Sequence, residues 1–186
     1  MKRSIRLVVS LALCVAPALC VGCTSVFPAR NPTGEALPRV TGETLTGGHL
    51  TLPDDLLGRP TVLLVIYQSL AQDEVNYWAM VATANMPDAQ LFEVAAFTQF
   101  KYFLTKRRII RQATDRIPEA LHDRLVGIWW DGSTLARFTG NPRDGHARLL
   151  LLDEHGQVLY FTDQGFNSQT MRDFLDAVRA LQERGE

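Results

Sequence analysis

The sequence has few cysteines, and none lies where a folded domain would use it. Its 186 residues include three cysteines, Cys14, Cys20 and Cys23, all close to the N-terminus. Because no cysteine follows Cys23, the rest of the chain has no thiolate nucleophile and no internal disulfide. Thiol-disulfide exchange and thiol-based peroxide reduction are therefore excluded for the folded part.

The sequence also lacks an excess of charge of one sign, an internal repeat and an apolar run long enough to span a bilayer. Its formal net charge is −1, with 46% hydrophobic and 21% charged residues. This composition is typical of one globular domain and not of a disordered chain. The near-neutral charge argues against a nucleic-acid partner.

The first 22 residues have the pattern of a secretory signal peptide. Lys2, Arg3 and Arg6 precede the largely apolar stretch Leu7–Leu19, which is too short to cross a membrane core of about 30 Å as a helix. The following Cys20-Val21-Gly22-Cys23 resembles a bacterial lipobox, although Cys20 stands where leucine is usual.

This resemblance predicts cleavage after residue 22 and a lipid anchor on Cys23. Thr24, which follows, favours the outer over the inner membrane. We therefore expect a periplasm-facing lipoprotein of the cell envelope. The alternative is cleavage at another site, which would leave a free cysteine.

Without its leader the chain carries 16 Lys and Arg against 20 Asp and Glu, a net charge of −4. Residues 23–39 contain three prolines and little apolar periodicity. They predict a flexible tether with a root-mean-square reach of roughly 20 Å. Residues 40–186 are predicted to form the domain.

The domain alternates strand and helix patterns. Thr61–Gln68 and Leu91–Phe97 read as buried strands. Ser69 and Gln72 match a capping box before a helix with an apolar stripe through Trp78. A second helix is expected from Phe100 to Ile117, ended by Pro118, then a short strand at 126–130.

The last fifty residues predict a hairpin and a helix. Leu149–Leu152 and Val158–Phe161 are apolar runs joined by a turn that contains Gly156. Asn167 or Ser168 can cap the final helix. The order of elements favours an α/β fold with a central mixed sheet and helices on both faces.

Two stretches resemble the redoxin branch of the thioredoxin-like superfamily. They are Leu50–Pro60 (LTLPDDLLGRP), leading into TVLLVIY, and Leu149–Val158 (LLLLDEHGQV). The resemblance implies a thioredoxin-like three-layer sandwich. Redox-active members carry Cys-x-x-Cys at the start of the first helix, which here corresponds to Ala71–Glu74, and a cis-proline where this chain has Ala147. The resemblance thus implies a redox-inactive variant.

A weaker resemblance is to mitochondrial ATP-synthase assembly factors of this fold. It is carried by the stretch from Tyr67 to Trp78, the basic helix from Lys101 to Arg111 and the hairpin. It implies a protein-binding role in assembly or chaperoning, with a client that is not identified.

In this fold the contact surface is the end of the sheet where the cysteines would lie. No catalytic residue, cofactor or metal is expected there. A metal carrier or thiol-independent enzyme using the same end is the alternative, with His146 and Asp144 or Asp153 as remaining ligands, although no histidine pair has ligand spacing. The candidate binding rim comprises Gln68, Ser69, Asp73, Glu74, His146 and Arg148.

Two further features are candidates for contact. Trp129 and Trp130 read as one core indole beside one partly covered indole, or as part of a binding surface. A cluster of positive charges is either a solvated helix face or a contact for anionic lipid or an acidic protein. It comprises Lys101, Lys106, Arg107, Arg108 and Arg111.

Overall fold

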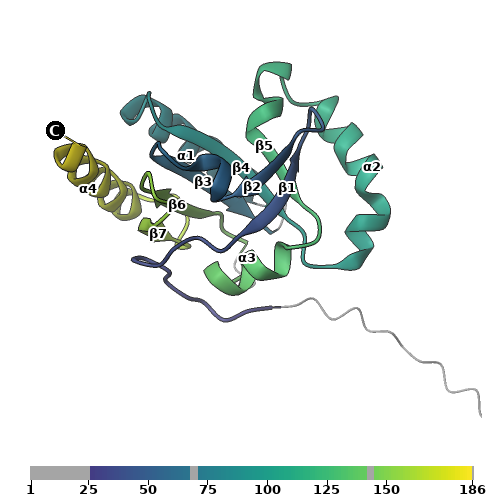
Figure 1. Cartoon of the computed structure of the whole chain (residues 1–186), viewed down its shortest axis with the longest axis horizontal. Helices are drawn as coiled ribbons and strands as arrows, with labels where there is room; N and C mark the ends of the chain where they lie inside the picture. The colour runs from purple at the N-terminus through teal and green to yellow at the C-terminus, as the bar shows by residue number, and fades with distance from the viewer. Residues whose placement is uncertain (1–25, 68–70, 142–144, 186) are drawn as a thin grey trace, which may run out of the picture.

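The computed structural model describes residues 26–67, 71–141 and 145–185, and its centre is a seven-stranded mixed sheet (Figure 1). The strand order is β2-β1-β5-β4-β3-β6-β7. The strands are β1 (Val40–Thr44), β2 (His49–Leu52), β3 (Thr61–Ile66), β4 (Gln90–Ala96), β5 (Leu125–Ile128), β6 (Arg148–Leu152) and β7 (Val158–Thr162). The helices are α1 (Gln72–Asn85), α2 (Phe100–Thr114), α3 (Gly132–Thr139) and α4 (Ser168–Gly185), with 3-10 turns η1 (Asp54–Leu56) and η3 (Glu119–Arg124).

Two apolar cores lie on opposite faces of the sheet because side chains alternate along each strand. Leu63 and Val65 of β3 face the core that contains α3, whereas Val62 and Leu64 face the core beneath α1 and α4. In Figure 1, α2 and α4 lie at opposite flanks of the sheet. The predicted mixed sheet with helices on both faces is confirmed. The core residues of the described chain all lie between Leu37 and Val178, so a chain of residues 24–186 keeps every one of them.

The N-terminal segment differs from its prediction as a free tether. Residues 26–39 lie against the domain, with Leu37 buried in the first core. Val158 donates to and accepts from the backbone of this segment, at 2.9 and 2.8 Å, and the amide of Phe27 donates to Asn141 at 2.6 Å. Two interactions hold the segment in place: the side chain of Leu37 is buried in the core, and the edge strand β7 supplies hydrogen-bond partners for the backbone. The folded unit therefore begins before residue 40.

The strands and helices that were predicted match in position. The hairpin of β1 and β2 and the helix α3 were not predicted. The capping box is wrong, because α1 begins at Gln72 after Ala71, with no side-chain cap, and Gln72 bonds Glu93 of β4 instead. Ser69 lies outside the described residues. Asn167 caps α4, as predicted, through the amides of residues 169 and 170 at 2.9 and 3.1 Å.

No helix in the described ranges is long and apolar enough to cross a membrane.

Candidate functional site

A carboxylate in the first turn of α1 joins that helix to the loop before β6. Glu74 Oε1 accepts a hydrogen bond from Nδ1 of His146 at 2.5 Å, and its Oε2 accepts one from the amide of Ala147 at 3.0 Å. Nδ1 of His146 carries the proton because a carboxylate only accepts. We call these three residues the Glu74 clasp.

A third segment, the turn before α4, closes on the clasp at Gly165. Gly165 has φ of +72°, which L side chains rarely adopt. A Cβ at this position would lie 2.7 Å from Nδ1 of His146 and 2.9 Å from Oε1 of Glu74. Glycine suits this position because of its positive φ, and a Cβ here would have to displace the side chains of the clasp.

A buried polar network lies beneath the clasp. Arg148 is 2% exposed, donates to the carbonyl of His146, and places its guanidinium 5.6 Å from the centre of the Tyr67 ring. The Tyr67 hydroxyl bonds Thr139 of α3 at 2.8 Å. Burial raises the pKa of Tyr67 well above its usual value, an effect that Thr139 and the charge of Arg148 partly oppose. The phenol thus stays neutral and acts as a hydrogen-bonding strut.

The exposed surface around the clasp is part aromatic. Tyr77, one helical turn after Asp73, is 52% exposed and stacks on Phe166 at 5.3 Å between ring centroids. Asp73 is exposed, and His146 is partly exposed. We call Asp73, Tyr77, His146 and Phe166 the rim surface. Aromatic side chains next to polar ones are typical of protein-contact surfaces.

The predicted binding rim is only partly reproduced. Glu74 and His146 meet directly, and Asp73 lies beside them in the exposed first turn of α1. Arg148 is not a rim contact, because its side chain is buried beneath the clasp. Gln68 and Ser69 lie outside the described residues. The sequence did not single out Thr139, Tyr77, Phe166 or Gly165, whose roles depend on contacts between distant segments.

The predicted basic cluster divides into an inward and an outward part. Lys106 points toward the sheet, pairs with Glu43 at 2.5 Å and lies 5.5 Å from the centre of the Trp129 ring. The other four basic side chains are exposed: Lys101, Arg107, Arg108 and Arg111. The two predicted tryptophan environments are present, with Trp129 buried and Trp130 exposed.

A crevice of about 150 Å³ lies between α2 and the sheet, with Glu93 in its wall. Most of the side chains that line it are apolar, and the described residues of α2 include none that is fully buried. Burial raises the pKa of Glu93, and the hydrogen bond from Gln72 partly opposes this. A carboxylate in such a place costs stability whenever it is ionised.

We therefore expect Glu93→Gln to be more stable than the parent at pH 7, with a melting temperature higher by on the order of 2 °C, and no different at pH 4. The folded-state pKa is raised, so the penalty is absent below the usual value of 4.5 and grows as pH rises through it. Thermal unfolding at both pH values measures this, with the exposed Asp88→Asn as control. An equal gain at both pH values would contradict it.

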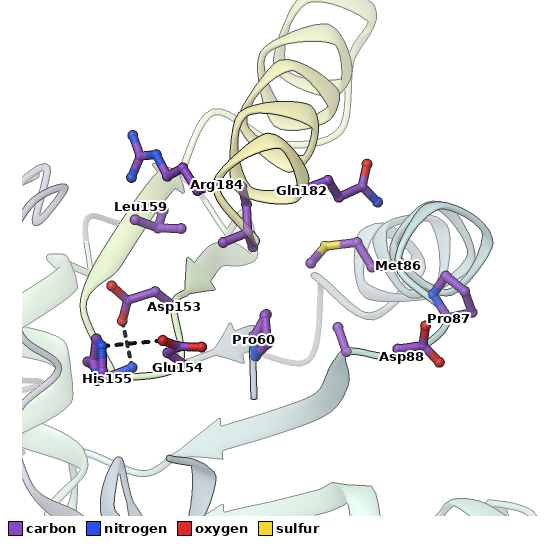
Figure 2. Close-up of a pocket in the computed structure, with 12 residues that line it drawn as sticks. Pro60, Met86, Pro87, Asp88, Asp153, Glu154, His155, Leu159, Gln182 and Arg184 are labelled. Carbon is purple, nitrogen blue, oxygen red and sulfur yellow. Dashed lines mark hydrogen bonds and ion pairs between the residues drawn. The ribbon is translucent and has the colours of Figure 1, made fainter. Parts of the chain in front are cut away.

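A larger pocket, of about 480 Å³, is shown in Figure 2. Its lining places it at the end of the sheet opposite to the clasp. It is bordered by the start of β3, the end of α1, the turn between β6 and β7, and α4. The Asp153 carboxylate accepts hydrogen bonds from the backbone amides of His155 and Gln157, at 2.9 Å each, and these bonds stabilise the turn. The exposed His155 and Glu154 are 3.4 Å apart. These side chains stabilise the turn between β6 and β7. Asp153, a predicted metal ligand together with His146, lies at the other end of β6 from His146.

Among the described residues, no group of three or more His, Cys, Asp or Glu side chains is placed to hold a metal ion. Asp144, the other partner expected for His146, lies outside the described residues.

Comparisons with known proteins place the fold. No family model and no curated protein matches the sequence. Copper-bound ScoI from Arabidopsis thaliana is 14% identical, with a TM-score of 0.52 over 77% of this chain and 98% of that chain. The thioredoxin domain of a thiol-disulfide oxidoreductase from Bacteroides vulgatus is 14% identical, with a TM-score of 0.54 over 80% of this chain and 97% of that chain. A thiol peroxidase from Chromobacterium violaceum is 11% identical, with a TM-score of 0.56 over 86% of this chain and 91% of that chain.

Such likeness at low identity defines the architecture. The chain has an α/β thioredoxin-like fold, as the sequence resemblance implied.

Proposed function

We propose that the protein is a lipid-anchored module of the bacterial cell envelope whose thioredoxin-like domain binds another protein and does no thiol chemistry. The proposed anchor is Cys23, on the periplasmic side of the outer membrane. The role resembles assembly or chaperoning, because the domain offers a contact surface and no thiol.

One observation carries the binding role: the Glu74 clasp occupies the start of α1, where redox-active relatives hold a thiolate. Its carboxylate satisfies His146 and the amide of Ala147. A thiolate site instead needs exposed amides and positive potential at this helix terminus. The clasp gives the rim surface a fixed shape, which lowers the entropic cost of binding.

Photo-crosslinking in cells tests the binding role. A photoreactive amino acid at Tyr77 should capture a defined protein, whereas the same group at His155, at the opposite end of the sheet, should not. Asp73→Lys should reduce the capture at least tenfold, since charge reversal at a contact disfavours a matched partner. An equal yield of crosslinked protein at both positions, or a yield unchanged by Asp73→Lys, would contradict the binding role.

Two assays separate this function from its alternatives. The purified domain should not reduce insulin disulfides, and reduction above the uncatalysed rate would contradict the absence of thiol chemistry. Calorimetric titration with copper or zinc tests the metal-carrier alternative. Stoichiometric binding at micromolar affinity that is lost in His146→Ala would favour the carrier and overturn the pure binding module.

The anchor is tested separately by the intact mass of the membrane-extracted protein. We expect cleavage before Cys23 and the added mass of acyl chains. An unmodified Cys23 would remove the proposed location without affecting the rim surface.

A further inference from the structure

The outward face of α2 combines exposed apolar and positive side chains. Phe100, Leu104, Arg107 and Arg111 follow helical spacing and form one stripe. Phe100 is 66% exposed and Leu104 72% exposed. The sequence of α2 contains no acidic residue, so nothing on the helix neutralises this face.

An aromatic cluster extends the apolar end of this stripe. Trp130 is 64% exposed, and its ring centroid lies 4.1 Å from that of Phe103 and 6.5 Å from that of Phe100. Trp130 contacts both phenylalanine rings in a tilted geometry, and the Phe100 and Phe103 rings stack on each other at 6.0 Å between centroids. A contiguous exposed apolar patch of this kind marks a contact surface.

The chemistry of the face matches a membrane interface better than an acidic protein. Tryptophan and phenylalanine settle at the boundary between headgroups and acyl chains, while guanidinium groups pair with lipid phosphates. An acidic protein patch would pair with the arginines. It would not explain the uncharged aromatic cluster beside them, which is buried favourably only in an apolar environment such as a bilayer.

The position of the face agrees with an anchored chain. Phe27, near the start of the described chain, lies under the guanidinium of Arg137 in α3. Trp130 precedes α3, whose eight residues span about 12 Å. Figure 1 shows the start of the described chain on the same side as the beginning of α2. Cys23 is three residues before Val26, a reach of at most about 10 Å.

We propose that this face, made of Phe100, Phe103, Leu104 and Trp130 with Arg107, Arg108 and Arg111, docks on a bilayer that contains anionic lipid. The aromatic cluster enters the headgroup boundary and the arginines bind lipid phosphates. Docking complements the proposed lipid anchor and orients the domain on the membrane.

Vesicle binding by residues 24–186, which lack Cys23 and therefore any anchor, tests the docking alone. We expect sedimentation with vesicles of phosphatidylglycerol and phosphatidylethanolamine, little with phosphatidylcholine alone, and weaker binding at high salt. Trp78 and Trp129 are buried. A blue shift of tryptophan emission and its quenching by brominated lipid therefore report Trp130.

Charge reversal supplies the decisive comparison. Each basic residue at an anionic surface contributes about fivefold in affinity, so loss of two positive charges costs about thirtyfold, and Arg107→Glu with Arg108→Glu, which also adds two negative charges, should weaken binding by more than about thirtyfold. Arg172→Glu with Arg184→Glu reverses two exposed arginines of α4 and should leave binding within about twofold. Phe100→Ser with Leu104→Ser should weaken it about tenfold without changing charge.

Several results would overturn the docking. They are no binding to anionic vesicles at low salt, equal losses in the α2 and α4 variants, or binding without a change in Trp130 emission. If the protein does not bind vesicles while Arg107→Glu with Arg108→Glu abolishes a crosslink to another protein, the face binds an acidic protein instead of a membrane. A missing lipid anchor would appear in the intact mass and leave this assay unchanged.

Discussion

Glu74→Ala is expected to lower the free energy of unfolding by about 3 kcal/mol. The substitution removes two hydrogen bonds and leaves the buried amide of Ala147 without its acceptor, a loss of about 1–3 kcal/mol by itself. Urea unfolding followed by tryptophan emission measures the loss. Asp73→Ala, in the same helical turn but exposed, should cost no more than about 1 kcal/mol.

Glu74→Gln refines this expectation. Its carbonyl oxygen can still accept from Ala147, and its amide can donate to Nδ1 of His146 once the imidazole proton moves to Nε2. The loss should therefore be about 1 kcal/mol. A double-mutant cycle of Glu74→Ala with His146→Ala should give a coupling of about 1 kcal/mol. Equal losses for Glu74→Ala and Asp73→Ala would show that the clasp does not form.

Gly132→Ala is expected to destabilise the protein by about 3 kcal/mol or more. A Cβ at Gly132 would lie 2.2 Å from the carbonyl oxygen of Phe97 and 2.6 Å from its carbonyl carbon. Both are backbone atoms of the residue that follows β4, so α3 and the sheet would have to separate. The melting temperature should fall by about 10 °C.

Ser133→Ala is the matched control for Gly132→Ala, because it changes the next residue of α3 at a partly exposed position. It should shift the melting temperature by less than about 2 °C. A similarly small shift for Gly132→Ala would mean that α3 does not approach the end of β4 as closely as described.

The elements with long apolar runs could be predicted from the sequence. β3 and the hairpin of β6 and β7 are central or well paired, and their buried residues follow one another without polar interruption. The hairpin of β1 and β2 was missed because its strands are short and largely polar. Gly42 in β1, whose Cβ would lie 2.3 Å from a side-chain carbon of Val126, lowers the strand signal further while allowing close approach to β5.

The clasp could be predicted only in part. The fold resemblance placed Glu74 and His146 at one end of the sheet. Which of Asp73 and Glu74 turns inward depends on where α1 begins, and the expected capping box placed that start too early. The burial of Arg148 depends on the Tyr67 ring and the carbonyl of His146, which only the folded chain brings beneath the rim.

The clasp also determines when in folding the rim surface takes its final shape. Its two hydrogen bonds join residues 72 and 73 positions apart, and the bond between Tyr67 and Thr139 closes a loop of similar length. Such nonlocal contacts form after helices and local hairpins, because the entropy of closing long loops must first be overcome. We therefore expect the rim surface to form late in folding, so that the proposed partner would recognise only the finished fold.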